Sequence, residues 1–175
     1  MIQEALGGKP LPFVAHPVVD ASRLPERRAA EIWDFENDMD EAASVELVAA
    51  VVNLLIHASS HGPPRPTPLA LDRLWRVREL IAASPAERRS LPELERVCGL
   101  DRWTLARQFR TAFGTSPSRF RKMRQLDLVR RSLCHGTSLV AASIEAGFAD
   151  QSHMSRHFKS AYGLTPGEWV SAAVA

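Results

Sequence analysis

The sequence contains little cysteine, no long apolar run and, in residues 69–175, no stretch that alternates apolar with polar residues. Cys98 and Cys134 stand in no metal-binding spacing, so they exclude a disulfide framework and favour a reducing, cytoplasmic compartment. The longest apolar stretch, residues 45–56, is too short to span a bilayer, and no secretory signal opens the chain. Phosphate-binding loops, metalloprotease motifs and nucleophile elbows are also missing, so we expect no enzyme, no cofactor and no metal site.

Charge is distributed unevenly along the 175 residues, although their formal net charge is only +2. Residues 1–71 hold 5 basic and 10 acidic side chains, a balance of −5. Residues 72–175 hold 17 basic and 10 acidic side chains, a balance of +7. The basic C-terminal part therefore points to an anionic partner.

A proline-rich segment, residues 61–68, divides the chain and is predicted to be a semi-rigid linker. The N-terminal segment, residues 1–60, is predicted to be irregular to about residue 20 and then to form helices over residues 22–39 and 41–58. The second of these helices is apolar around most of its circumference, which predicts burial on more than one side. Residues 69–175 are predicted to be helical throughout, beginning with a helix that has Pro68 in its first turn and Trp75 in the core.

A pattern occurs twice in the C-terminal part, at an offset of 48 to 49 residues. Each copy has a short helix, a turn containing glycine, an acidic cap and a longer helix, at about residues 90–114 and 138–163. This arrangement is typical of a helix-turn-helix unit. The sequence thus predicts an all-α fold with two tandem helix-turn-helix subdomains, joined by a long helix over residues 117–135 and preceded by a helical N-terminal segment.

The longer helix of each copy carries two different faces. At 100° per residue, Leu105 and Phe109 share one face, as do Met154 and Phe158 in the second copy, and these faces are expected in the core. The opposite, exposed face bears side chains suited to a DNA major groove, where Arg pairs with guanine and Gln with adenine. One such face could be an ordinary solvated surface, but two matching copies in a basic domain favour DNA reading.

The second copy carries a long and specific motif. It consists of Gly147-Phe148-Ala149-Asp150-Gln151-Ser152-His153-Met154-Ser155-Arg156-His157-Phe158-Lys159, then Gly163-Leu164-Thr165-Pro166 and Trp169. With this motif, residues 69–170 resemble the DNA-binding domain of AraC/XylS-type transcription regulators. The resemblance implies that two recognition helices enter successive major grooves of double-stranded promoter DNA, about 34 Å apart. It also implies activation of transcription through contact with RNA polymerase.

The resemblance assigns roles to individual residues when it is carried over position by position. Base reading falls on Trp103, Ala106, Arg107, Gln151, Ser152, Ser155 and Arg156. Phosphate contacts are expected at Arg102, Arg110 and Lys159, and at the helix N-termini marked by Asp101, Ser116, Asp150 and Thr165. His153 and His157 have a spacing that can hold a metal, but no third ligand is suggested nearby, so packing or phosphate contact is the stronger interpretation.

Residues 16–58 resemble the helical segment that lies between the effector-binding barrel and the DNA-binding domain in many of these regulators. The resemblance implies a homodimer through helix 41–58, and we expect no barrel because too few residues precede Asp20. An alternative stays open, namely a protein-interaction module that pairs with full-length regulators through this helix. Sequence-specific duplex binding by the isolated chain would favour the regulator, and binding only in mixed dimers would favour the module.

Overall fold

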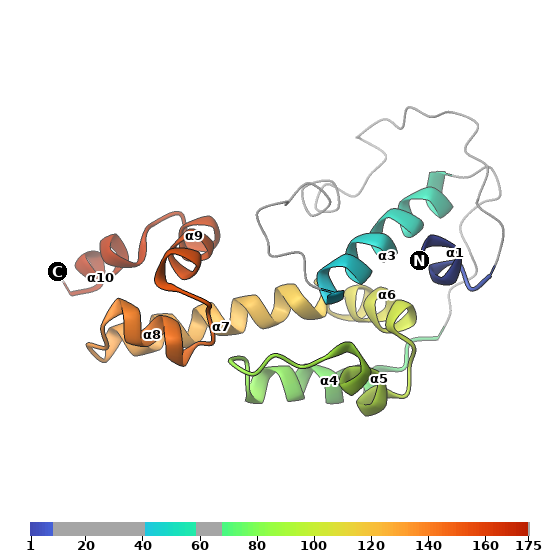
Figure 1. Ribbon diagram of the computed structural model, residues 1–175, viewed down its shortest axis with the longest axis horizontal. Coiled ribbons are helices and arrows are strands. Elements are labelled where there is room, and N and C mark those ends of the chain that lie inside the picture. Colours follow the sequence, from blue (N-terminus) through green and yellow to red (C-terminus); the bar gives the residue numbers. More distant parts are fainter. Residues whose placement is uncertain (9–40, 59–67, 175) are drawn as a thin grey trace. The chain divides into compact units, whose positions relative to one another are not determined.

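The computed structural model describes residues 1–8, 41–58 and 68–174, and all regular structure within these ranges is helical (Figure 1). This confirms the predicted all-α fold. The expected helix 22–39 and most of the proline-rich segment lie outside the described residues. No described helix is both long enough and apolar enough to cross a membrane. The helices are α1 Ile2–Ala5, α3 Glu41–Ala58, α4 Leu71–Ala83, α5 Leu91–Cys98, α6 Arg102–Phe113, α7 Pro117–Cys134, α8 Leu139–Glu145, α9 Gln151–Tyr162 and α10 Pro166–Val174.

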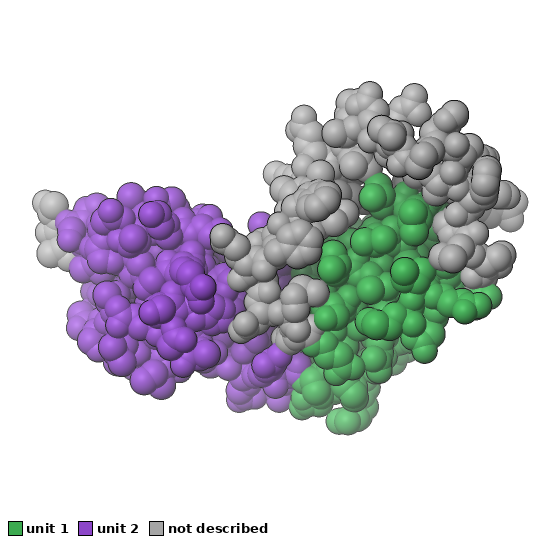
Figure 2. Space-filling view, turned by 45° about the horizontal axis from the view of Figure 1, so that its top comes forward, with its two compact units in different colours: residues 1–75, 90–116 green, residues 76–89, 117–175 purple. Residues whose placement is uncertain are grey.

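The chain folds into two compact units (Figure 2). Unit 1 comprises the described parts of residues 1–75 and 90–116, and unit 2 those of residues 76–89 and 117–175. The boundaries between the units fall inside α4, between α4 and α5, and between α6 and α7, not at the proline-rich segment. Each unit holds one copy of the sequence repeat, with α5 and α6 in unit 1 and α8 and α9 in unit 2.

Side-chain caps fix the beginnings of the repeated helices. At α5, the Glu93 carboxylate accepts the Ser90 N–H at 2.8 Å, and the Ser90 hydroxyl accepts the Glu93 N–H at 3.4 Å. Asp101 caps α6 by accepting two backbone N–H groups, at 3.1 and 3.0 Å. Ser138 caps α8 and Asp150 caps α9, each by accepting one backbone N–H group. These short polar residues satisfy N–H groups that have no partner within the helix.

The interior of unit 1 centres on Phe109, whose side chain is fully buried. Its ring meets the edge of Phe113 at 4.6 Å, and Phe113 in turn meets Trp75 at 5.3 Å. The prediction that Trp75 lies in the core is wrong, since this side chain is 47% exposed. In α4 the buried positions are Leu74, Val77 and Ile81, and Trp75 lies outside the stripe that these three define.

The beginning of α4 is set by Gln108, a residue of α6. We expected Pro68 in the first turn of this helix, but α4 begins only at Leu71. The Gln108 side chain accepts the backbone N–H of Ala70 at 3.0 Å and donates to the Pro68 carbonyl at 3.5 Å. Because these backbone groups bond to a buried side chain, residues 68–70 stay outside the helix.

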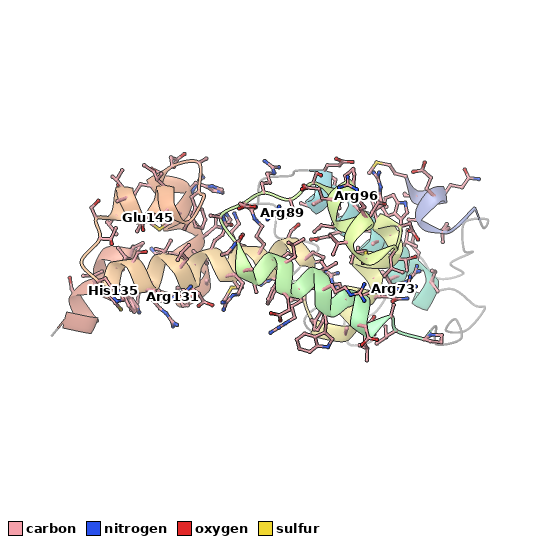
Figure 3. The ribbon with its side chains drawn as sticks, turned by 90° about the horizontal axis from the view of Figure 1, so that it is seen from below. Arg73, Arg89, Arg96, Arg131, His135 and Glu145 are labelled. Carbon is pink, nitrogen blue, oxygen red and sulfur yellow. The ribbon has the colours of Figure 1, made fainter. Side chains whose placement is uncertain are left out.

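At the end of α5, Cys98 is buried and Gly99 adopts a left-handed conformation with φ of 62°. The Cys98 thiol donates to the Leu94 carbonyl at 3.0 Å, and burial raises the pKa of this thiol. Arg73 of α4, which is labelled in Figure 3, donates to the Gly99 carbonyl at 3.4 Å. Cys98 is thus a small residue buried at the end of α5.

Helix α3 belongs to unit 1, where it packs against α1 and α6. Val45 and Val52 are buried, with exposed fractions of 2% and 3%. The other apolar side chains of α3 that the structure describes are partly buried. Contacts within the chain thus cover part of the apolar surface of this helix.

An apolar cluster in the interior of unit 2 is contributed by α7, α8, α9 and the turn between α8 and α9. Partly buried side chains of α10, Trp169 and Val170, pack against it. Two polar side chains of α7 fasten the surrounding backbone. Gln125 donates to the Ala146 carbonyl at 2.7 Å, and Arg121 donates to the carbonyls of residues 85–87 at 3.0 to 3.3 Å. The cluster consists of Leu126, Val129, Leu133, Ala142, Ala146, Phe148, Met154 and Phe158.

Two glycines of unit 2 have similar left-handed backbone conformations but different space around them. Substituting each one therefore separates the cost of backbone strain from the cost of a steric clash. Gly147 has φ of +74°, and a Cβ there would lie 2.4 Å from the Ala86 carbonyl oxygen. Gly163 has φ of +77°, and a Cβ there would meet nothing within 4 Å. We expect Gly163→Ala to lower the free energy of unfolding by about 1 kcal/mol. Gly147→Ala should cost about 1–3 kcal/mol more, because the backbone of Ala86 must move. Urea unfolding followed by circular dichroism measures both, and equal losses would contradict the contact.

The Asp101 cap predicts a pH-dependent stability. Partial burial opposes ionisation, yet hydrogen bonds from Thr104 and Trp103 and the nearby Arg107 hold the pKa of this carboxyl below its usual value. A lowered folded-state pKa stabilises the fold above the unfolded value of about 3.9, and this contribution is lost as the pH falls through the folded value.

We therefore expect Asp101→Ala to cost about 1 kcal/mol at neutral pH and less below about pH 4. The matched control is Asp101→Asn, which keeps the acceptor oxygen but does not titrate. Urea titrations at several pH values measure the difference from the parent chain. A penalty for Asp101→Ala that stays constant from pH 7 to 3 would rule out this contribution of the charge.

Candidate nucleic-acid interface

Helices α6 and α9 are held in their units by equivalent pairs of apolar residues. Leu105 and Phe109 of α6 are 1% and 0% exposed, and Met154 and Phe158 of α9 are both 0% exposed. The two residues of each pair are four apart and so lie on one side of their helix. The predicted core face is therefore confirmed in both copies, and it fixes which side chains point the other way.

The outward face of α9 gathers the side chains predicted to read DNA in the second copy. Gln151, Ser152 and Arg156 are exposed, Ser155 is partly buried, and Lys159 is exposed one turn beyond Arg156. Within the described part of the chain, Arg156 takes part in no ion pair. The guanidinium group is thus presented to solvent beside an amide and hydroxyls, a combination suited to base edges in a major groove.

His153 and His157 contact each other along α9. Their Nε2 atoms are 2.7 Å apart, so one ring donates a hydrogen bond that the other accepts. The His153 ring also meets the edge of Phe148, with 5.7 Å between ring centroids. In the ranges that the structure describes, no three His, Cys, Asp or Glu side chains are placed to hold a metal ion. Both rings pack against Phe148, beside the core of unit 2.

The corresponding face of α6 has different surroundings. We expected it to be exposed, and this is wrong because α3 packs against it. Ala106 is only 7% exposed and forms a buried cluster with Val45 of α3 and Leu91 of α5, against which Trp103 also packs. Two of the three base-reading residues predicted on α6 are thus in contact with the cluster that joins α3 to α6.

Charged groups line the same contact. Arg102, an expected phosphate contact, pairs with Glu41 of α3 at 3.0 Å and with Glu95 of α5 at 3.6 Å. Arg107 donates to the Thr104 hydroxyl at 3.4 Å. The basic side of α6 therefore faces carboxylates of its own chain. A hollow between α3 and α6 is lined by Glu46, Ala49, Ala50, Asn53, Ala106, Arg107, Arg110 and Ser116.

The hydroxyl residues proposed for phosphate contact occupy unequal positions. Ser116 is buried, with 5% of its surface exposed. Thr165 forms a reciprocal cap with Glu168, whose carboxylate accepts the Thr165 hydroxyl at 2.7 Å and its N–H at 2.8 Å. These hydrogen bonds lower the pKa of the Glu168 carboxyl. An anion would reach the N-terminus of α10 only by competing with Glu168.

Sequence reasoning missed the residues that surround α6 on its outward side. Glu41 and Val45 contact this face, yet neither belongs to the repeat. The available signals were the acidic balance of residues 1–71 and the apolar circumference of residues 41–58. Both features indicated that the helix over residues 41–58 has a partner, but neither identified α6 as that partner.

Comparison with known proteins places this geometry in context. Residues 94–172 match a family described as a helix-turn-helix domain. The HTH-type transcriptional regulator RipA of Corynebacterium glutamicum is 29% identical over 112 residues, which cover 64% of this chain and 33% of RipA. The transcriptional activator NphR of a Rhodococcus species is 29% identical over 158 residues, covering 87% of this chain and 47% of NphR. The chain therefore spans between a third and a half of the length of these relatives.

Solved structures show the same fold. A probable AraC family transcriptional regulator from Rhodopseudomonas palustris superposes with a TM-score of 0.54 at 25% identity, covering 58% of this chain and 97% of that one. The DNA-binding domain of AdpA, solved in complex with a target DNA, superposes with a TM-score of 0.53 at 21% identity. That match covers 57% of this chain and 91% of the AdpA chain.

Proposed function

We propose that the chain carries a DNA-binding domain of the AraC/XylS type, and that it regulates transcription by binding promoter DNA with α6 and α9 as its two recognition helices. The observation that carries the proposal is the face of α9, on which Gln151, Ser152 and Arg156 are exposed while Met154 and Phe158 anchor the opposite side. The same division of faces recurs in α6. Two helices with this same arrangement suit two successive major grooves, which follow each other about every 34 Å along the duplex.

Base reading follows from the functional groups on each helix. Arg156 and Arg107 can each donate two hydrogen bonds to O6 and N7 of guanine, and Gln151 can pair with adenine. Ser152 and Ser155 can bond to either, and Trp103 and Ala106 can contact the methyl group of thymine. In this proposal, α9 distinguishes bases in one groove mainly through polar hydrogen bonds. In the other groove, α6 distinguishes them through a more apolar contact.

Phosphate contacts would fix the position of both helices on the duplex. Lys159 is exposed beside the reading face of α9, and Arg110 and Arg102 flank the reading face of α6. The backbone N–H groups at the starts of the helices capped by Asp101 and Asp150 add partial positive charge. The balance of +7 over residues 72–175 supports attraction to the duplex along this whole part of the chain.

The direction of regulation is inferred from a relative. NphR is named a transcriptional activator, and we propose that this chain likewise activates transcription, through contact with RNA polymerase.

A homodimer through residues 41–58 is part of the same proposal. Although α3 buries Val45 and Val52, its Leu47, Leu54 and Ile56 are only partly buried, so apolar surface remains for a second copy.

Substitution of Arg156 tests base reading. Against the duplex selected from a random pool by the parent chain, Arg156→Ala should lose about 1–3 kcal/mol of binding free energy and relax the preference at one base pair. Lys159→Ala is the matched control, because it removes a cation from the same helix but should weaken binding to all duplexes about equally. Fluorescence anisotropy with matched and single-substituted duplexes measures both. Unchanged discrimination by Arg156→Ala would remove this residue from the readers.

The salt dependence of binding tests the phosphate contacts. With several cations on phosphates, the logarithm of the affinity should fall linearly and steeply with the logarithm of the salt concentration, by about 0.9 for each phosphate contacted. Anisotropy titrations with a random duplex at four or five salt concentrations measure this slope. A slope near zero would remove DNA as the partner of the basic part of the chain.

A further inference from the structure

We propose that α3 is a built-in competitor of DNA, which covers the reading face of α6 and must leave it before this helix can enter a major groove. The inference rests on the proposed DNA-binding function. It concerns contacts within unit 1 alone, between residues 41–58 and the first recognition helix. Nothing equivalent covers α9 among the residues that the structure describes, since its reading face carries exposed Gln151, Ser152 and Arg156.

The apolar part of the contact occupies the centre of the reading face. Val45 of α3 is 2% exposed and Ala106 of α6 is 7% exposed, and the two belong to one cluster. Ala42 and Ala49, one turn to either side of Val45, and Trp103 of α6 pack against the same cluster. Because Ala106 and Trp103 would contact thymine methyl groups, α3 and the bases require the same surface of α6.

The charged part of the contact resembles the one that a phosphate backbone would make. Glu41 places its carboxylate 3.0 Å from the guanidinium of Arg102. Glu46, five residues further along α3, lines the hollow that also contains Arg107 and Arg110. A helix from the acidic part of the chain thus offers carboxylates to cations that would otherwise meet phosphates or base edges.

The dimensions of DNA make the two states exclusive. The major groove is about 12 Å wide and admits one helix, whose diameter with side chains is about 10–12 Å. A second helix packed on α6 would have its axis about 8–10 Å away, where the groove has no room for it. The closed chain therefore binds DNA through α9 alone, and release of α3 adds the first reading helix.

Release of α3 should be visible as a gain in affinity. The apparent dissociation constant equals the intrinsic one divided by the fraction of open molecules. If α3 is off α6 in a tenth of the molecules, complete release tightens binding to a two-groove site about tenfold. A shorter duplex with only the half recognised by α9 should show no such gain.

The first test uses two full-length variants with opposite changes of charge. Glu41→Arg removes the ion pair with Arg102, and its matched control is Glu4→Arg, an equal change at an exposed residue of α1 paired with the chain N-terminus. Val45→Asp inserts a carboxylate into the buried cluster, and its control is Leu71→Asp at a position that is 47% exposed. Duplex affinity is measured by anisotropy, after circular dichroism has verified helix content.

The proposal predicts that Glu41→Arg and Val45→Asp both bind the two-groove duplex about tenfold more tightly than their controls. Net charge alone would change the affinities of the two variants in opposite directions. Affinities equal to those of the controls would overturn the competition while leaving DNA binding intact. Absence of duplex binding by the parent, both variants and both controls would overturn the proposed function, and the competition with it.

The second test needs no substitution and covers the case in which Val45→Asp fails to fold. Hydrogen exchange of the peptide 41–58 is followed in the parent chain with and without the two-groove duplex. Competition requires faster exchange of this peptide when DNA is bound, because α3 loses its cover. Unchanged or slower exchange in a DNA-saturated sample would overturn the proposal.

Discussion

The structure depends on one constraint, that a recognition helix of 12 residues is unstable alone and must be fixed by an apolar face. Phe109 in α6 and Phe158 in α9 meet this constraint, each fully buried and each with a second apolar residue one turn earlier. Such a pair fixes both the position of a helix and its rotation about its own axis. The identity of the outward side chains, and hence the chemistry offered to a partner, follows from where these rings are buried.

The two copies share this anchor but differ in what lies on the other side. On α9 the outward face carries an amide, hydroxyls and a guanidinium that are open to solvent. On α6 the outward residues include Trp103 and Ala106, which are apolar enough to pack against another helix as well as against bases. Because α6 has small and aromatic residues where α9 has polar ones, α6 offers a surface on which α3 can dock. Duplication of a helix-turn-helix unit thus does not duplicate its environment.

Much of this could be predicted from the sequence because the signals are local. Asp101 and Asp150 predicted caps that the structure contains, and the spacing of Leu105 with Phe109 predicted a core face. Contacts between residues distant in sequence could not be predicted in this way. The delayed start of α4 depends on Gln108, which is 38 residues from the N–H that it accepts. The cover on α6 likewise depends on Glu41 and Arg102, which are 61 positions apart.

The two cysteines of the chain are chemically unequal. Cys98 is 2% exposed, its thiol is hydrogen-bonded to the Leu94 carbonyl, and burial raises its pKa, so little of it exists as the reactive thiolate. Cys134, at the C-terminal end of α7, is exposed. A maleimide dye added to the native chain near neutral pH would therefore attach at one position. The folded protein supplies a single point of labelling for fluorescence or spin-resonance measurements, with no cysteine to be removed first.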